Sequence, residues 1–143
     1  FADLPWAPQV TYRYTRYSAS WDSLFSGLSS GYGTWFQGEV AANYAGPFNS
    51  NTGIHHVGVK ATALENLTVG VLYFDFDTVR TRDSLNLDAR ELDVYLEWAV
   101  NDHLIISPLV GLYQPRKDER SGGNQVGGNG TNVYSQLTVA VPF

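Results

Sequence analysis

Acidic side chains spaced along residues 91–97 are the strongest candidates for chemistry in this sequence. Glu91, Asp93 and Glu97 lie on one side of a segment in which apolar and polar residues alternate. Carboxylates two residues apart on a strand lie ~6.6 Å apart, which suits a glycosidase acid pair or a Ca²⁺ site. No neighbouring motif defines a cleft for a substrate. We therefore predict no catalytic residue and no enzyme activity, and a lipid or glycan hydrolase is the less favoured alternative.

The histidines do not indicate a metal site. His55 and His56 are adjacent in a segment that alternates, so their side chains should point to opposite faces of a sheet. His103 lies in an expected turn, and the chain has no cysteine. No Gly-x-Ser-x-Gly motif is present, and the glycines of residues 122–130 follow no strand-to-helix step. We predict no metal and no cofactor.

The composition is typical of a β-protein with two different faces. The 143 residues are 14% aromatic and only 16% charged, below the usual quarter. Mean hydropathy is −0.20, and no apolar run approaches the ~20 residues of a membrane helix. The net charge of −5 argues against nucleic acid as a partner. The missing initiator methionine is consistent with a removed signal peptide.

Alternation of period two predicts strands along most of the chain. The clearest case is 90–100, where Leu92, Val94, Leu96 and Trp98 oppose the acidic side. A helix would scatter these residues around its axis. We expect one domain, 1–143, with about seven strands near 10–17, 34–44, 53–64, 67–77, 90–100, 104–113 and 131–143.

The connections between these strands differ in length. Residues 65–66 and 101–103 are short turns, whereas 45–52, 78–89 and 114–130 are longer. Short turns at one end and long loops at the other are typical of an up-and-down membrane barrel. The loop 18–33 does not fit this rule. It contains apolar anchors such as Trp21 and Phe25, so we expect it to fold back onto the protein.

The last strand ends on an aromatic residue. Val133, Leu137, Val139, Val141 and Phe143 share one face, whereas terminal segments of soluble proteins usually become polar and frayed. This ending resembles the final strand of bacterial outer-membrane barrels, in which it is an assembly signal.

Several segments resemble the alginate export family of outer-membrane barrels. They are Leu4-Pro5-Trp6-Ala7-Pro8 with Tyr12-Arg13-Tyr14, Trp21-Asp22-Ser23-Leu24-Phe25, Gly31-Tyr32-Gly33-Thr34-Trp35-Phe36-Gln37-Gly38-Glu39, Gly70-Val71-Leu72-Tyr73-Phe74-Asp75-Phe76, Glu91-Leu92-Asp93-Val94-Tyr95 and Trp98-Ala99-Val100-Asn101-Asp102-His103. The resemblance implies a barrel that passes a polysaccharide such as alginate, or another solute. The family's barrels are longer than this chain, and single-chain bacterial barrels close with an even strand number, not seven.

The sequence therefore predicts an all-β fold: the C-terminal strands of a larger, antiparallel up-and-down transmembrane β-barrel in the bacterial outer membrane. A pore wide enough for a polymer needs ~16 to 18 strands. The alternative is a soluble module, or a small barrel without a pore, that binds a partner or acts as a scaffold.

Polar side chains on the other face of the strands would line a channel. The three inward carboxylates of residues 90–100 would repel a polyanion, which argues against a polyuronate as the solute of this channel. Expected partners are outer-membrane lipid and lipopolysaccharide, a polysaccharide or small polar solute, and the barrel assembly machinery through the strand of Phe143. The predicted pore-lining residues are Arg13, Gln37, Glu39, Lys60, Glu91, Asp93, Tyr95 and Glu97.

Overall fold

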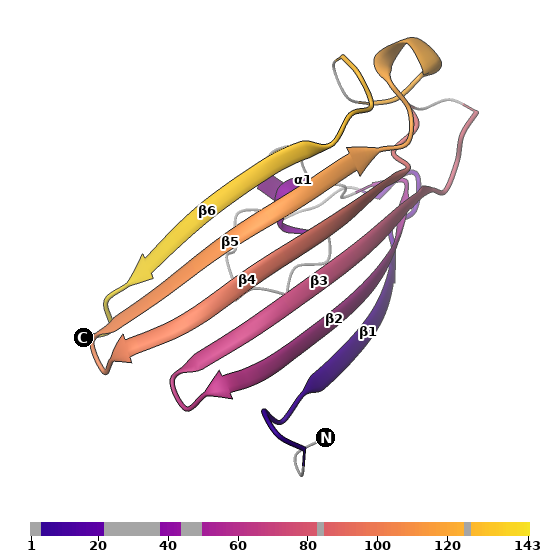
Figure 1. The fold of residues 1–143 in the computed structure, drawn as a ribbon. Helices are drawn as coiled ribbons and strands as arrows, with labels where there is room; N and C mark the ends of the chain where they lie inside the picture. The colour runs from indigo at the N-terminus through magenta and orange to yellow at the C-terminus, as the bar shows by residue number, and fades with distance from the viewer. Residues whose placement is uncertain (1–3, 22–37, 44–49, 83–84, 125–126) are drawn as a thin grey trace.

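The structure is a computed structural model that describes residues 4–21, 38–43, 50–82, 85–124 and 127–143. Within these residues the fold is a single six-stranded antiparallel sheet in the order β1-β2-β3-β4-β5-β6 (Figure 1). The all-β, up-and-down prediction is confirmed. The sheet is not closed, and β1 and β6 are its edges in the described part of the chain. The strands are β1 (Gln9–Arg16), β2 (Thr52–Leu64), β3 (Leu67–Thr78), β4 (Ala89–Asn101), β5 (Leu104–Pro115) and β6 (Asn132–Ala140).

Two short turns join the strands at one end of the sheet. Residues 65–66 connect β2 to β3, and residues 102–103 connect β4 to β5. The Asn101 side chain accepts a hydrogen bond from the His103 amide at 2.9 Å, and the Asn66 side chain donates to the Ala99 carbonyl at 3.2 Å. The first bond is local and stabilises its own turn, whereas the second joins the β2–β3 turn to the end of β4.

The predicted strand 34–44 is wrong for residues 39–43, which form the short helix α1 (Glu39–Asn43). Residues 34–37 and 44 lie outside the described residues. The alternation of Val40 and Ala42 resembled a strand, but Glu and Ala favour helix. Gly38 has φ of 78°, a left-handed conformation that interrupts an extended chain. Tertiary contacts, described below, then hold the helix.

This correction also changes the pattern of connections. Residues 17–51 form one connection between β1 and β2, at the same end as residues 79–88 and 116–131. The strand ends that the three long connections join therefore lie at one end of the sheet and both short turns lie at the other, so the exception at 18–33 disappears. Residues 18–21 of that loop are described and the remainder lies outside the described residues. A 3₁₀ turn, η1 (Glu119–Ser121), lies in the last long connection.

The two faces of the sheet differ in composition. We call the face against which α1 lies the inner face, and the opposite one the outer face (Figure 1). Alternate residues of the central strands are buried on the inner face, whereas their neighbours on the outer face are exposed. The buried apolar cluster consists of Val40, Ala41, Ile54, Leu72, Phe74, Phe76, Ala89, Tyr95, Leu109 and Tyr113.

The side chains of β4 show this division most clearly. Leu92 and Val94 are 39% and 44% exposed on the outer face, while Glu91 and Asp93 are 1% and 0% exposed on the inner face. At these positions of β4 the charges are buried and the apolar side chains are exposed, whereas β2, β3 and β5 bury apolar side chains such as Ile54, Phe74 and Leu109 on the same inner face. The predicted alternation of apolar and acidic residues between the two sides of this strand is therefore observed, but Glu91 and Asp93 are buried and do not line an open surface.

Candidate functional site

The inner face carries a buried acidic pair beneath α1. Glu91 and Asp93 are neighbours on one face of β4, and both lie against the start of the helix. The first amides of a helix have no partner within the helix, and buried carboxylates are costly unless they accept hydrogen bonds. The acidic pair and the helix start therefore satisfy one another.

Three consecutive helix amides donate to the pair. The Val40 amide donates to Glu91 Oε1 at 2.7 Å, and the Ala41 amide donates to Glu91 Oε2 at 2.8 Å. The Glu39 amide donates to Asp93 Oδ2 at 3.4 Å. Both oxygens of Glu91 are thus used by backbone N–H groups, which fixes the position of α1 on the sheet. We call these three contacts the α1 latch.

Two glycines make the close approach of α1 possible. A Cβ atom on Gly38 would lie 2.6 Å from Glu91 Oε1, and one on Gly111 would lie 2.2 Å from Val40 Cγ2. Real side chains do not approach so closely. A glycine within a strand often marks a place where another backbone comes near, and Gly111 of β5 serves this purpose for α1.

Most predicted pore-lining residues that the structure describes lie on the inner face. Lys60 is exposed there and Glu97 is half-buried. Tyr95 is buried against Gly70, where a Cβ atom would lie 2.2 Å from its ring. Arg13 lies opposite His56 across β1 and β2.

Two of those predicted residues stand apart. Gln37 lies outside the described residues. Glu39 is buried on α1, not on a strand. Thus the structure brings together Glu39, Glu91 and Asp93, whereas Arg13, Lys60 and Glu97 are placed on other parts of the inner face.

The histidines lie on opposite faces, as predicted. His56 is buried on the inner face and stacks on Phe74 with ring centroids 4.4 Å apart. His55 lies on the outer face, where it is hydrogen-bonded to Tyr12 at 2.9 Å. Across the described ranges, no group of three or more His, Cys, Asp or Glu side chains could hold a metal ion.

The outer face changes from apolar to polar along a straight line. One row of cross-strand partners consists of Tyr12, Val57, Tyr73, Leu92, Leu112 and Val133. The next row toward the long connections, here called the boundary row, consists of Tyr14, His55, Asp75, Arg90 and Gln114. The change occurs at the same register level on the four central strands β2 to β5, whereas β1 has a tyrosine in both rows.

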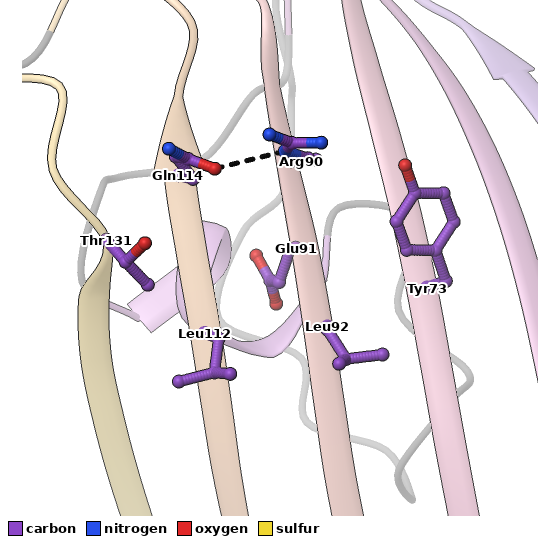
Figure 2. Close-up of a pocket in the computed structure, with 7 residues that line it drawn as sticks. All are labelled: Tyr73, Arg90, Glu91, Leu92, Leu112, Gln114 and Thr131. Atoms are coloured by element: carbon purple, nitrogen blue, oxygen red, sulfur yellow. Dashed lines mark hydrogen bonds between the residues drawn. The ribbon is translucent and has the colours of Figure 1, made fainter.

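A shallow hollow of about 260 Å³ lies where the two rows meet (Figure 2). Figure 2 shows Glu91 directed toward α1, behind the strand, whereas Leu92 and Leu112 lie on the near side of their strands. Within the described residues, no helix is long and apolar enough to cross a membrane.

Sequence reasoning missed the α1 latch. The alternation predicts strands at Val40, Ala41 and Gly111. It also predicts that Glu91 and Asp93 line a water-filled channel. One indication was available: Gly58, Gly70 and Gly111 interrupt inward positions of three strands, where glycine implies a close neighbour.

Comparisons with protein-family models, with curated proteins and with solved structures find no match to this chain. Fold and geometry must therefore support any functional conclusion.

Proposed function

We propose that this chain forms part of the wall of an outer-membrane β-barrel channel, with the outer face in lipid and the inner face toward the lumen. The observation that carries this proposal is the exposed apolar outer face, which is bounded on β2, β3, β4 and β5 by a polar residue at the same register level. Contiguous apolar surfaces of this extent mark sites of membrane or protein contact.

Strand length supports the same function. β2 and β4 have 13 residues and β3 and β5 have 12. Tilted strands of ~9–11 residues cross the hydrocarbon of a bilayer. Each of these four strands is therefore long enough to cross it, with residues to spare. Short turns at one end and long connections at the other match the outer-membrane arrangement.

The free edges of the sheet require further strands. No backbone polar group can stay unpaired in hydrocarbon, so β1 and β6 must pair with strands beyond the six described here. These strands would belong to a larger barrel, as the resemblance to alginate export barrels implies.

In this barrel, α1 narrows the lumen from the inside. The helix is anchored on β4 through Glu91 and Asp93 and packs on β5 through Gly111. It also covers two of the three carboxylates that the sequence places on this wall. The open charges of that wall are then chiefly Lys60 and Glu97. This wall would therefore repel a polyanionic solute less than its three carboxylates imply, and we propose a polysaccharide or a small polar molecule as the solute.

Planar-bilayer conductance of the complete, folded protein tests the proposal. We expect stepwise channel currents, and we expect Glu97→Arg to shift ion selectivity toward anions. Glu65→Arg, in an exposed turn, is the matched control and should shift selectivity less. Folded protein that stays in the aqueous phase without detergent, and gives no current, would instead favour the soluble binding or scaffold module.

The same proposal assigns two partners by position. Lipid and lipopolysaccharide would contact the outer face, and the barrel assembly machinery would bind the last strand. In the structure β6 ends at Ala140, and Val141 and Phe143 are exposed beyond it. Deletion of Phe143 should lower the amount of protein assembled in the membrane without changing its synthesis.

A further inference from the structure

The hollow on the outer face combines an apolar floor with a cationic rim (Figure 2). Its floor is formed by Tyr73, Leu92 and Leu112, which are cross-strand neighbours. Its rim is formed by Arg90 and Gln114, with Thr131 at the entry to β6. One side of the hollow therefore suits hydrocarbon, and the other suits an anion.

Arg90 is the cation of this rim that is available to a ligand. Its Nε donates to the neutral Gln114 amide oxygen at 3.1 Å, and among the described residues it makes no ion pair. Asp75 faces Arg90 across the strands, but Asp75 is bound by Arg116. Arg116 also lies 3.7 Å from Asp77. The nearby carboxylates Asp75 and Asp77 are therefore paired with Arg116 and not with Arg90.

Cations gather at this end of the sheet. Two of the nine Lys and Arg residues of the chain, Arg13 and Lys60, lie on inner positions of the strands. Of the other seven, Arg90 lies in the boundary row, Arg16 ends β1 beyond that row, and five lie in the long connections; none lies at the end that carries the short turns. They are Arg16, Arg80, Arg82, Arg90, Arg116, Lys117 and Arg120. Five carboxylates of the described residues, Asp75, Asp77, Asp88, Asp118 and Glu119, lie at the same end, so an anionic ligand would be attracted by individual cations such as Arg90 and not by the net charge of this end.

We propose that the hollow binds the phosphate-bearing headgroup of an anionic membrane lipid, with the phosphate on Arg90 and the start of an acyl chain over Leu92 and Leu112; this inference rests on the proposed function, because it places the boundary row at the membrane surface. A guanidinium binds phosphate with two parallel hydrogen bonds. The bond from Nε to Gln114 holds the side chain on the rim and leaves its terminal nitrogens for the ligand.

Lipid binding to the complete protein tests this site. Detergent-solubilised wild type, Arg90→Gln and Lys60→Gln would be titrated with phosphatidylglycerol or phosphatidylcholine, and bound lipid would be counted by native mass spectrometry. Lys60→Gln removes an exposed cation from the inner face and is the matched control. We expect Arg90→Gln to weaken phosphatidylglycerol binding about tenfold, as for one lost charge-assisted hydrogen bond, and Lys60→Gln to leave it unchanged within about twofold.

Three results would overturn the site: equal binding by Arg90→Gln and wild type, equal binding of the two lipids, or full displacement of phosphatidylglycerol by inorganic phosphate, which would indicate a site for free anions. Flotation of each variant with liposomes separates this site from the proposed function. Protein that floats but shows no effect of Arg90→Gln contradicts only the lipid site. Protein that does not float contradicts both proposals.

Discussion

Gly111 leaves the space that Val40 occupies: a Cβ atom at Gly111 would lie 2.2 Å from Val40 Cγ2 and 2.5 Å from Asp93 Oδ1. Two parts of the chain some seventy positions apart therefore fit only because β5 lacks a side chain here. The contact joins the packing of α1 to the acidic pair that holds it, so one added methyl group should disturb both.

Gly111→Ala should displace α1 from the sheet. Overpacking of this kind costs ~1–3 kcal/mol, and the helix is short enough to move instead of the strands. We expect a lower free energy of unfolding in urea and, in the proposed channel, a larger single-channel conductance. Gly130→Ala is the matched control, because no heavy atom lies within 4 Å of its added Cβ. Equal behaviour of the two variants would show that Val40 does not occupy this space.

Glu91→Gln should weaken the α1 latch without changing side-chain size. Glu91 accepts from the Val40 and Ala41 amides through its two oxygens, whereas glutamine offers one oxygen and one NH₂ donor. One amide would then face a donor, at a cost of ~1–3 kcal/mol. The free energy of unfolding in urea measures this loss when Glu91→Gln is compared with wild type. Glu97→Gln on the same strand is the control. A cost for Glu97→Gln as large as that for Glu91→Gln would contradict the latch.

The strand pattern was predictable because alternation is a local property. Leu92, Val94 and Trp98 showed their face through spacing alone, since side chains of a strand point to opposite faces in turn. The inner or outer position of a carboxylate such as Glu91 followed from the same rule. The six strands and their order therefore needed no information from distant parts of the chain.

The α1 latch was not predictable in this way. Residues 39–43 form a helix and not a strand because of their contacts with Glu91, Asp93 and Gly111. These residues are about fifty to seventy positions away in the sequence. Local propensity is weak compared with such tertiary contacts. The sequence predicts that Glu91 faces water, because a charge is costly when it is buried unpaired. The α1 amides that pair with Glu91 lie in a segment that alternation predicts to be a strand.

Acidification should remove the stabilising effect of Asp88, which lies between β3 and β4. Asp88 Oδ1 accepts from the Thr78 amide and hydroxyl, both at 2.7 Å. Partial burial acts to raise its pKa, but contacts with Asn86 and Thr78, together with Arg116, lower the pKa of Asp88 below its usual value. A depressed pKa contributes stability above the unfolded value of ~3.9 that is lost as pH falls through the folded value.

Asp88→Asn should therefore cost ~1 kcal/mol at neutral pH and progressively less below pH ~4. The free energy of unfolding of both proteins, measured as a function of pH, checks this. Asp102→Asn in an exposed turn should stay within ~0.5 kcal/mol of wild type. A difference between Asp88→Asn and wild type that is constant with pH would contradict the assigned hydrogen bonds.

Val94→Arg places a charge in the centre of the outer face, where Val94 lies between Val71 and Val110 and is 44% exposed. If that face contacts lipid, an arginine near the midplane costs ~2–4 kcal/mol, and the fraction of protein that inserts into liposomes should fall. Thr62→Arg adds the same side chain at an exposed position of the inner face and should insert normally. An exposed valine in water would tolerate arginine within ~0.5 kcal/mol, so equal insertion of the two variants would contradict a lipid-facing outer surface.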